Sequence, residues 1–378
     1  MKNKIKIMHV LNSVGGVDVS LRLILENIDP EQFENVVVHG VNDTKKQYLN
    51  KHGEKLKEFK FRISREINLF NDLLALFNTI KILKKEKPNL VHAHSAKGGI
   101  IARAASLFYK TTVLHTPQAY SYLSAPRGLK RTIFLSIEKL FKNFNSILLA
   151  SSKSELERGI NEVGYKKTNT LLFNNSILPI ELNNSEIQHV VTWPKSYICS
   201  VGRPSYQKNV EMMVEVIKCV KDKIPSIHLV LMGIGEYSPN VNSVKELIKK
   251  YGLEKNITLV KWIKREEIFK IVYSSTLYVS TARYEGLPYS IIESLALSKA
   301  CVVTDADGNR DLVIDGENGF LVKNNDIQNM ADKICRLIED KKLRNEMEQQ
   351  SLNLFNQKFN MSTNIIQLEK IYEKLAVR

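Results

Sequence analysis

Long apolar segments are missing from this sequence of 378 residues: no run of about 18 uncharged apolar residues occurs, so no membrane-spanning helix is expected. Lys6 and His9 interrupt the apolar stretch of residues 5–11, and no small-residue cleavage site follows it. This stretch is therefore predicted to be a first β-strand rather than a signal peptide. No low-complexity tract or short repeat occurs either. The sequence predicts a protein that stays in the cytoplasm.

Cysteine is also scarce, and no two cysteines form a Cys-x-x-Cys pair. The four are Cys199, Cys219, Cys301 and Cys335. Their wide spacing excludes a disulfide framework and a cysteine-based zinc site, so each is predicted to be a small buried side chain.

Apolar residues are nevertheless frequent and regularly spaced, which excludes intrinsic disorder. Hydrophobic residues make up 43% and charged residues 25%, as in ordinary globular proteins. A chain well above about 250 residues usually divides into two hydrophobic cores. Short apolar runs alternate with segments of helical periodicity from end to end, and this alternation predicts parallel α/β sheets.

A domain break is predicted at residues 174–195, which are rich in asparagine, lack helical periodicity and end in Trp193-Pro194. The strands expected before it lie near residues 5–11, 36–39, 90–94, 112–115, 147–150 and 170–173. Those expected after it lie near residues 197–201, 228–232, 257–260, 277–280 and 300–304. An α/β domain of residues 1–180 and a second of residues 181–361 would each bind ligands at the carboxyl ends of the strands.

The strongest local pattern runs from Glu285 through Gly286-Leu287-Pro288 to Glu293, after an apolar strand and into a helix. Pro288 suits the first helical turn, and the free N–H groups of a helix N-terminus attract phosphate. Glu285 and Glu293 offer two carboxylates, which accept hydrogen bonds from pairs of sugar hydroxyls. The alternative is that Glu285 only caps the helix while Glu293 is solvated.

A second pattern, at residues 200–209, follows the first strand of the second domain. Gly202 permits a tight exit from the strand, and Arg203 and Lys208 bring two cations to the end of the sheet. Two fixed cations suit a diphosphate leaving group, whose developing negative charge they stabilise. The alternative is an ordinary basic loop.

Together these patterns resemble the family-4 glycosyltransferases, retaining enzymes of GT-B architecture that use nucleotide-sugar donors. The family pattern of two glutamates separated by seven residues, after a Gly-Arg…Lys-Asn loop, is present here. The resemblance extends to Gly15-Gly16, to the glycine loop at residues 231–236, and to residues 308–313 and 315–322. It implies two Rossmann-like domains facing each other across a cleft. A C-terminal helix, about residues 362–378, would cross back to the first domain.

The resemblance also implies roles for the matching residues. Arg203 and Lys208 would bind the donor diphosphate, Glu285 the hydroxyls of the transferred sugar, and Glu293 the ribose. Backbone N–H groups around Gly286 and Leu287 would approach the sugar and the phosphate, and Pro288 would also belong to the donor site. The other donor-binding residues would be Gly15, Gly16, Gly233, Gly235, Trp262, Ile263, Gly286 and Leu287. No cofactor and no metal are implied.

His115 ends the strand expected at residues 112–115, where family members carry a histidine that contacts the donor sugar. It is therefore the preferred catalytic histidine, the alternative being a strand-end residue with a structural hydrogen bond. His92 and His94 point the same way along a strand, a spacing that can ligate zinc. No third ligand is apparent in the sequence, so both are predicted to be structural or on the acceptor side.

Two features depart from simple expectations. Asp305-Ala306-Asp307 is an Asp-x-Asp triplet, which binds a divalent metal in a different glycosyltransferase architecture. Here the triplet follows a strand of the second domain, where the family uses no metal, so a loop is predicted. Lys261 stands where family members often carry glycine, which alters the geometry expected of the base pocket.

The formal net charge is +15, and residues 81–142 hold 12 Lys and Arg against 2 Asp and Glu. Within this stretch, the segment from Arg127 to Phe144 carries apolar residues at helical spacing. A basic amphipathic helix of this kind can lie on an anionic bilayer. The alternative, left open by the sequence, is that the apolar stripe packs on the sheet and the cations are solvated.

The sequence thus predicts a metal-independent hexosyl- or N-acetylhexosaminyl-transferase. It would move the sugar with retention from a UDP-sugar to a glycan or lipid-linked glycan in surface polysaccharide biosynthesis. It is expected in the cytoplasm or peripherally at the inner face of the cell membrane. Two alternatives are a GT-B relative with other chemistry, such as a nucleotide-sugar epimerase, and a nucleic-acid-binding protein. The second has little support, because no helix-turn-helix, zinc finger or RNP-like pattern is present and no nucleic acid partner is expected.

Overall fold

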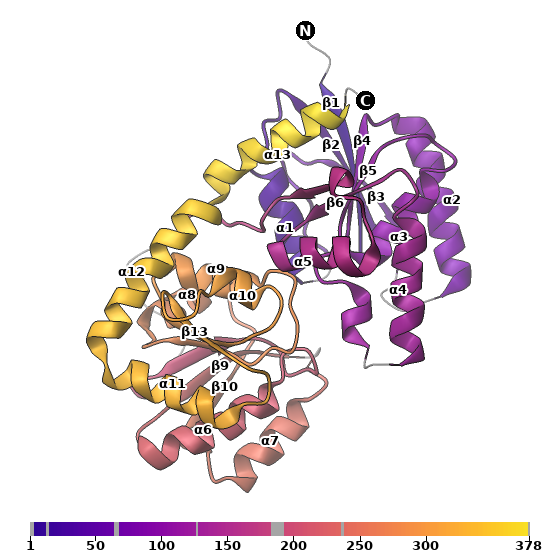
Figure 1. The fold of residues 1–378 in the computed structure, drawn as a ribbon. Coiled ribbons are helices and arrows are strands. Elements are labelled where there is room, and N and C mark those ends of the chain that lie inside the picture. The colour runs from indigo at the N-terminus through magenta and orange to yellow at the C-terminus, as the bar shows by residue number, and fades with distance from the viewer. Residues whose placement is uncertain are drawn as a thin grey trace. The chain divides into compact units, whose positions relative to one another are not determined.

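The computed structural model describes residues 4–12, 15–63, 68–125, 128–182, 193–235 and 238–376. The chain forms two compact units (Figure 1). Unit 1 comprises Met1–Ile177 and Asn360–Arg378, and unit 2 comprises Leu178–Phe359. Residues 183–192 of the expected linker, and Arg127 at the start of the expected interfacial segment, lie outside the described residues.

Unit 1 contains a seven-stranded parallel sheet in the order β3-β2-β1-β4-β5-β6-β7. Its strands are β1 (Ile5–Leu11), β2 (Phe33–Gly40), β3 (Lys57–Phe61), β4 (Leu90–His94), β5 (Val113–Thr116), β6 (Ser146–Ala150) and β7 (Thr170–Leu172). The order reverses where β1 pairs with β2 on one side and with β4 on the other. Such a reversal is the point at which open α/β sheets bind ligands.

Helices cover both faces of this sheet, because successive residues of a strand point to opposite faces. The helices are α1 (Gly16–Leu25), α2 (Leu69–Glu86), α3 (Ser95–Ala105), α4 (Leu129–Phe141), α5 (Lys153–Arg158) and α13 (Met361–Ala376). On β1, Met8 joins a core formed with α2 and α3, whereas Ile7 joins a core formed with α1 and α13. The sheet is therefore packed on both sides.

The last helix returns to unit 1, as the GT-B resemblance implied. Met361, Ile365, Leu368, Tyr372 and Leu375 of α13 are buried in the same cluster as Ile7 and other sheet residues. The N–H of Met361 donates to the carbonyl of Ile177 at 2.8 Å, next to the point where the chain leaves unit 1. This hydrogen bond joins the two segments of the chain that make up unit 1.

Unit 2 contains a six-stranded parallel sheet in the order β10-β9-β8-β11-β12-β13. Its strands are β8 (Ile198–Val201), β9 (Leu229–Ile234), β10 (Ile257–Lys261), β11 (Tyr278–Ser280), β12 (Cys301–Thr304) and β13 (Gly319–Val322). If the strands are numbered within the unit, this is the Rossmann order 3-2-1-4-5-6. Strands β1 to β6 of unit 1 have the same order, and β7 is added beside β6. The order reverses between β8 and β11.

The helices of unit 2 follow the strands in alternation. They are α6 (Val210–Lys223), α7 (Val241–Lys250), α8 (Arg265–Ser274), α9 (Tyr289–Ala296), α10 (Asn309–Leu312), α11 (Ile327–Glu339) and α12 (Lys341–Lys358). Buried side chains of α6, α7, α11 and α12 form one core with one face of the sheet. Among the described residues, no helix combines the length and the apolar composition that a membrane span requires.

Four elements were not expected from the sequence. Strand β3 mixes charged and aromatic residues and occupies the edge of its sheet, where charges prevent association with another edge. Helix α10 and strand β13 were recognised only as parts of family patterns. Helix α12 is mostly polar and buries only Met347, Ser351, Leu354 and Phe355, so its hydrophobic periodicity is weak.

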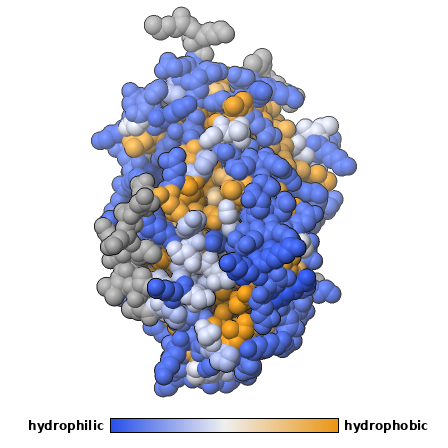
Figure 2. Space-filling view, turned by 90° about the vertical axis from the view of Figure 1, so that its left-hand side faces the viewer, coloured by the Kyte–Doolittle hydropathy of each residue, from blue (hydrophilic) through white to orange (hydrophobic). Residues whose placement is uncertain are grey.

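Three of the four cysteines are buried and Cys219 is half-buried, and all are free thiols. Burial raises the pKa of the Cys199 thiol to about 12, so this thiol is not reactive. The face of the molecule drawn in Figure 2 is mostly hydrophilic, with hydrophobic areas between.

Candidate active site

The loops that leave β8 and β11 meet at the point where the unit 2 sheet reverses its strand order. Cys199 of β8 pairs with Tyr278 of β11. The Tyr278 hydroxyl accepts from the N–H of Val201 at 3.3 Å and donates to its carbonyl at 3.4 Å. Because the phenol is fully buried, its pKa is raised and it stays protonated. The ends of the two strands are thus joined directly before the predicted site.

Lys208 and Glu285 form the central ion pair of this edge. The Lys208 Nζ lies 2.7 Å from Glu285 Oε1, and Gln207 Nε2 donates to Glu285 Oε2 at 3.1 Å. The Glu285 side chain is 9% exposed and that of Lys208 is 24% exposed. Lys208 and Gln207, both in the loop after β8, therefore fix the orientation of the two carboxylate oxygens. Such interactions are stronger in a largely buried site than in water.

The loop that carries these cations is anchored to the segment after β11. The N–H of Arg283 donates to the Gln207 carbonyl at 2.8 Å, and the Arg283 guanidinium lies 4.5 Å from the centre of the Tyr206 ring. Thr281 Oγ1 donates to the carbonyl of Asn209 at 2.9 Å. Asn209 has φ of 50° and precedes α6, so the loop turns sharply into the helix.

Arg203 lies in the same loop and is half-buried. Beside it, Gly233 at the end of β9 has φ of +102°, and a Cβ there would lie 3.4 Å from the Gly202 carbonyl carbon. A larger residue at Gly233 would therefore be strained by the backbone conformation and would contact the backbone that presents Arg203. The loops after β8 and β9 are in close contact.

The side of the site predicted to bind the base is formed by Gly235 and Trp262. A Cβ on Gly235 would lie 2.4 Å from Trp262 Cδ1, so the indole ring packs directly on the glycine. Trp262 remains 62% exposed and Ile263 is half-buried. A register shift between β9 and β10 occurs at Val260 and Lys261, and Lys261 itself is exposed. An exposed indole is a surface on which an aromatic base can stack.

Glu293 on α9 is bound by Arg265, the first residue of α8. The Arg265 Nε donates to Glu293 Oε1 at 3.0 Å, and its Nη2 contacts the same oxygen. Burial raises the pKa of the Glu293 carboxyl, and the guanidinium only partly opposes that effect. Sequence reasoning missed Arg265, because it belongs to no motif and its contact spans 28 residues of sequence.

The backbone of Gly286 and Leu287 rests on the loop after β12. Gly308 has φ of +75°, and a Cβ there would lie 2.5 Å from the Gly286 carbonyl oxygen. Asn309 is fully buried and donates to the Thr304 carbonyl at 3.0 Å. Pro288 is the residue before α9 and not part of its first turn, which differs from the expectation. Gly308 and Asn309 thus support the predicted sugar-binding segment.

The Asp-x-Asp triplet lies in a loop, as expected, and both carboxylates bind one arginine. Arg310 Nε donates to Asp305 Oδ1 at 2.8 Å, and Arg310 Nη1 donates to Asp307 Oδ1 at 3.0 Å. These ion pairs give the two acidic side chains a local structural role at the start of α10.

In unit 1, Gly15 and Gly16 form the N-terminal end of α1. Gly15 has φ of +62°, no neighbouring atom lies within 4 Å of a Cβ built there, and both glycines are exposed. A backbone of this kind is open to the approach of a ligand.

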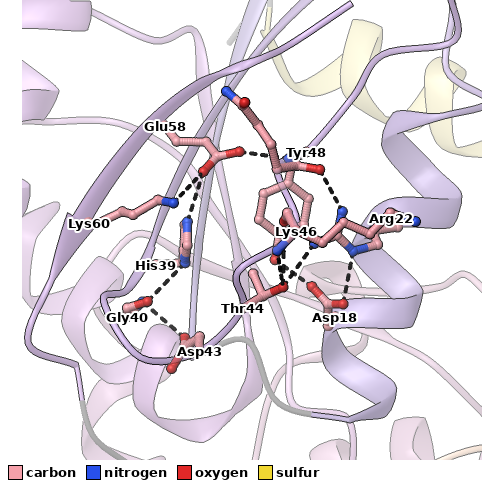
Figure 3. Close-up of polar contacts among 11 residues, drawn as sticks. Asp18, Arg22, His39, Gly40, Asp43, Thr44, Lys46, Tyr48, Glu58 and Lys60 are labelled. Atoms are coloured by element: carbon pink, nitrogen blue, oxygen red, sulfur yellow. Dashed lines mark hydrogen bonds and ion pairs between the residues drawn. The ribbon is translucent and has the colours of Figure 1, made fainter. Parts of the chain in front are cut away.

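A polar cluster holds the segment after β2 against α1 (Figure 3). Arg22 donates to Asp18 at 2.9 Å, to the Lys46 carbonyl at 2.6 Å and to Thr44 at 3.2 Å, and it lies over the Tyr48 ring. The Tyr48 hydroxyl donates to Asp18 at 2.8 Å. Since Asp18 is in the first turn of α1, these bonds fix the helix end that begins at Gly16.

His115 is fully buried, and its Nε2 lies 3.3 Å from the Ser95 carbonyl. A Cβ on Gly99 of α3 would lie 2.3 Å from the same nitrogen, so the ring is enclosed by the helix. Burial and the nearby Arg103 guanidinium hold the pKa of His115 well below its usual value. This placement favours the alternative of a structural histidine, because a contact with the donor sugar needs an exposed ring atom.

His92 and His94 have a third histidine beside them, contrary to what the sequence suggested. His9 of β1 lies with them, and one nitrogen of each lies within 4.8 Å of the others. Both nitrogens of His9 and of His92 have hydrogen-bond partners, including Tyr372 of α13 at 2.6 Å from His92 Nδ1. Those bonds favour a structural role, and burial lowers the pKa of all three imidazoles, to about 4 for His9.

The ends of β4 and β5 also hold a strained segment that sequence reasoning missed. Ser95, Gln118 and Ala119 have φ of 64°, 53° and 78°, which is uncommon outside glycine. Among the described residues, His94 Nδ1, Ser95 Oγ, His115 Nδ1 and Gln118 Nε2 are buried and have no hydrogen-bond partner. Strain and unmet hydrogen bonds of this kind cluster at functional sites.

Two helices of unit 1 expose large apolar side chains. On α4, Leu129, Ile133 and Leu140 are exposed, whereas Phe134 packs on the sheet. On α2, five side chains of the first two turns and a half are 45–77% exposed. They are Leu69, Phe70, Leu73, Leu74 and Phe77. Figure 1 shows α3 between these two helices. The apolar surface is therefore larger than the α4 stripe that the sequence indicated.

Two family models match the chain, "Glycosyl transferases group 1" over residues 185–353 and "Glycosyl transferase 4-like" over residues 19–152. The chain is 28% identical to UDP-Gal:alpha-D-GlcNAc-diphosphoundecaprenol alpha-1,3-galactosyltransferase of Escherichia coli, covering 99% of this chain and 98% of that protein. It is 24% identical to the capsular polysaccharide biosynthesis glycosyltransferase CapM of Staphylococcus aureus, over 98% and 97%. The structure of Anabaena Alr3699/HepE with UDP and glucose matches with a TM-score of 0.81 at 18% identity, over 98% and 100%.

Two Rossmann-like units with charged loops at the switch point of the second sheet define the GT-B class of glycosyltransferases. The chain belongs to this class, and specifically to the family-4-like glycosyltransferases.

Proposed function

We propose that this enzyme transfers a hexosyl or N-acetylhexosaminyl group, with retention and without a metal, from a UDP-sugar to a lipid-linked glycan. The observation that carries the proposal is the Lys208–Glu285 ion pair at the switch point of the unit 2 sheet. In this pair, a cation suited to a leaving diphosphate lies at hydrogen-bonding distance from a carboxylate suited to sugar hydroxyls.

The donor occupies the loops of unit 2 in the following way. Arg203 and Lys208 bind the diphosphate, and an ammonium group has three donors, so Lys208 can contact both Glu285 and a phosphate oxygen. Glu285 accepts from the hydroxyls of the transferred sugar. Glu293, held by Arg265, accepts from the ribose hydroxyls. The uracil ring stacks beside Trp262, next to Gly233, Gly235 and Ile263.

The reaction proceeds on one face of the sugar, with the departing phosphate deprotonating the incoming hydroxyl. A double displacement would need an enzyme carboxylate at the anomeric carbon. Both Glu285 oxygens are already bound by Lys208 and Gln207, which makes Glu285 a poor nucleophile. The cations then carry most of the stabilisation of the leaving group.

The acceptor is assigned to unit 1, and a lipid carrier is supported by two observations. The relative from Escherichia coli is named for a diphosphoundecaprenol acceptor. The helices α2 and α4, which expose large apolar side chains, also carry the cations Lys81, Lys84 and Lys130. Exposed apolar residues combined with lysines are typical of surfaces that bind anionic bilayers. We infer peripheral binding to the inner face of the cell membrane through these helices.

Product analysis with a panel of nucleotide sugars tests the proposal. The purified enzyme is expected to hydrolyse one UDP-sugar slowly and to transfer its sugar to a polyprenyl diphosphate glycan with an α-anomeric proton signal in NMR spectra. A β-linked product would overturn retention. Release of a free sugar epimer without acceptor would indicate an epimerase instead, and a salt-sensitive shift of DNA or RNA without donor turnover would indicate a nucleic-acid-binding protein.

Vesicle sedimentation tests the membrane assignment separately. Phe70→Ser with Phe77→Ser on α2 is expected to reduce sedimentation with phosphatidylglycerol vesicles at least fivefold while donor hydrolysis stays unchanged. Gln349→Ser with Gln350→Ser, two exposed residues of α12 outside this surface, is the matched control. Equal sedimentation of the α2 variant and wild type would overturn the α2 surface as the lipid contact.

A further inference from the structure

A surface pocket of about 780 Å³ lies at the amino-terminal edge of the unit 1 sheet. It is lined by residues that directly precede four neighbouring strands, such as Asn89 before β4, Thr112 before β5, Asn145 before β6 and Asn169 before β7. Leu375 near the end of α13 also lines it. The strands are parallel, so this edge is opposite the one that carries Gly15 and His115. The pocket is therefore separate from the candidate active site.

The charge of the pocket is strongly one-sided. Lys110, Lys142 and Lys166 line it, and its other lining residues include no aspartate or glutamate. The two acidic residues of the basic stretch 81–142 are committed elsewhere, because Glu86 binds Lys57 at 2.6 Å and Glu138 binds Arg103 at 2.9 Å. Three lysines in one concave surface repel one another unless an anion lies between them.

Two details describe the wall of the pocket. Thr111 lines it and is 8% exposed, and its Oγ1 is a buried hydroxyl without a hydrogen-bond partner among the described residues. A buried hydroxyl of this kind gains when a partner supplies the missing hydrogen bond. Gly164 has φ of +85°, and the Lys142 side chain packs against it, with Nζ 3.8 Å from the position that a Cβ would take.

We propose that this pocket binds a group carrying a phosphate or diphosphate. Lysine ammonium groups are strong, compact partners for phosphate oxygens. The volume exceeds that of inorganic phosphate and falls in the range of small-molecule sites, so the pocket has room for a group larger than the phosphate alone. That chemistry fits both the headgroup of an anionic phospholipid and a free phosphorylated metabolite. The assignment is independent of the transfer reaction, since none of these residues belongs to the donor site.

The lipid source has one specific argument in its favour. Leu107 and Phe108, which follow the end of α3, are 56% and 63% exposed and precede Lys110 by three and two residues. Apolar side chains next to lysines allow a headgroup to be held while the acyl region is in contact with the protein surface. A soluble metabolite would need no such neighbours.

Titration with inorganic pyrophosphate tests the site. It is performed on the full chain carrying Arg203→Ala and Lys208→Ala, so that the donor-site cations do not contribute. Adding Lys110→Gln, Lys142→Gln and Lys166→Gln is expected to weaken pyrophosphate binding at least tenfold. The matched control changes Lys45, Lys51 and Lys55, three exposed lysines of the same unit, to Gln and is expected to have no effect. Equal weakening by both sets, or no measurable pyrophosphate binding before the change, would overturn the proposal.

Two further measurements make the result specific. Thr111→Val removes the unmet hydroxyl without altering charge and is expected to weaken binding severalfold, with an unfolding temperature no lower than that of the wild type as proof that the variant folds. Sedimentation with vesicles of phosphatidylglycerol and phosphatidylcholine, against phosphatidylcholine alone, identifies the source. Loss of charged-vesicle binding in the pocket variant but not in the control assigns a lipid headgroup. Loss of pyrophosphate binding alone assigns a soluble phosphorylated ligand.

Discussion

The carboxyl edges of the two sheets share one strand order but differ in chemistry. In unit 2 the edge carries charged side chains in defined pairs, Lys208 with Glu285 and Arg265 with Glu293. In unit 1 the same edge is filled by neutral imidazoles that are fully buried, His92, His94 and His115. The same topology thus carries paired charges in one unit and buried neutral side chains in the other. A Rossmann-like fold alone does not determine which of the two an edge becomes.

The largest effect is expected from removing a cation of the unit 2 edge. Lys208→Ala should lower the turnover of donor about 10²–10³-fold, or about 3–4 kcal/mol, because an oriented charge at a developing anion is lost. The initial rate of UDP release measures this loss. Lys245→Ala, an exposed lysine on α7, is the control and should retain wild-type turnover. Near-normal turnover of Lys208→Ala would contradict the proposal that the charged edge of unit 2 stabilises the leaving diphosphate.

A smaller effect is expected from protonating the unit 1 histidines. Their pKa values in the folded state lie well below the usual value of about 6.5, so the unfolded chain binds more protons between these values. The contribution of the neutral histidines to the free energy of unfolding is therefore present above about pH 6.5 and is lost as the pH falls below it. From pH 7 to pH 6 each histidine should cost about 0.7 kcal/mol and the three His9, His92 and His94 about 2 kcal/mol. Urea unfolding at the two pH values measures this loss, and identical stabilities would contradict it.

The bond between α13 and the sheet gives the next effect. Thr116 Oγ1 donates to the Leu149 carbonyl at 2.8 Å and so accepts from His92 Nε2, which leaves His92 Nδ1 to accept from Tyr372. Tyr372→Phe would leave this nitrogen unpaired and should cost about 1–3 kcal/mol of unfolding free energy. Tyr273→Phe, at an exposed tyrosine, should cost less than about 0.5 kcal/mol. Equal urea midpoints for the two variants would show that the bond does not hold α13.

The smallest effect is expected at the acidic triplet of unit 2. Asp305→Asn with Asp307→Asn should keep turnover within about twofold and reduce stability by less than about 1 kcal/mol, as for partly exposed ion pairs. Wild-type turnover should also survive EDTA. Loss of turnover restored only by manganese or magnesium would show that charged residues at this edge bind a metal.

Much of the fold was predictable from the sequence, because parallel strands buried on both faces are continuous apolar runs. Helix α4 was also predictable, because it lies within the segment from Arg127 to Phe144, whose apolar residues recur at helical spacing. Strand β3 was not, since its charged residues lie at a sheet edge, and neither was α12, since only four of its residues are buried. In each case the local sequence lacks the periodicity because little of the element faces a core.

The candidate site was only partly predictable for a different reason. Gly202, Lys208 and Glu285 form short patterns on strand ends, so they could be found by spacing. Arg265 could not, because 28 residues of sequence separate it from its partner Glu293. His9 could not, because its partner His94 lies on the neighbouring strand β4. The burial of His115, which α3 covers at Gly99, could not be found from the sequence either. Exposure depends on what packs over a residue, and local sequence does not encode that.

The sequence by itself determined the alternation of strands and helices, the two-domain division and the charged loops of the second domain, since these depend on local periodicity and turn chemistry. Only the tertiary structure decided which charges are paired and which face a pocket. Three lysines from separate loops, Lys110, Lys142 and Lys166, meet at one edge because parallel strands align their amino ends. Three histidines lose their charge because two packed layers exclude water from them.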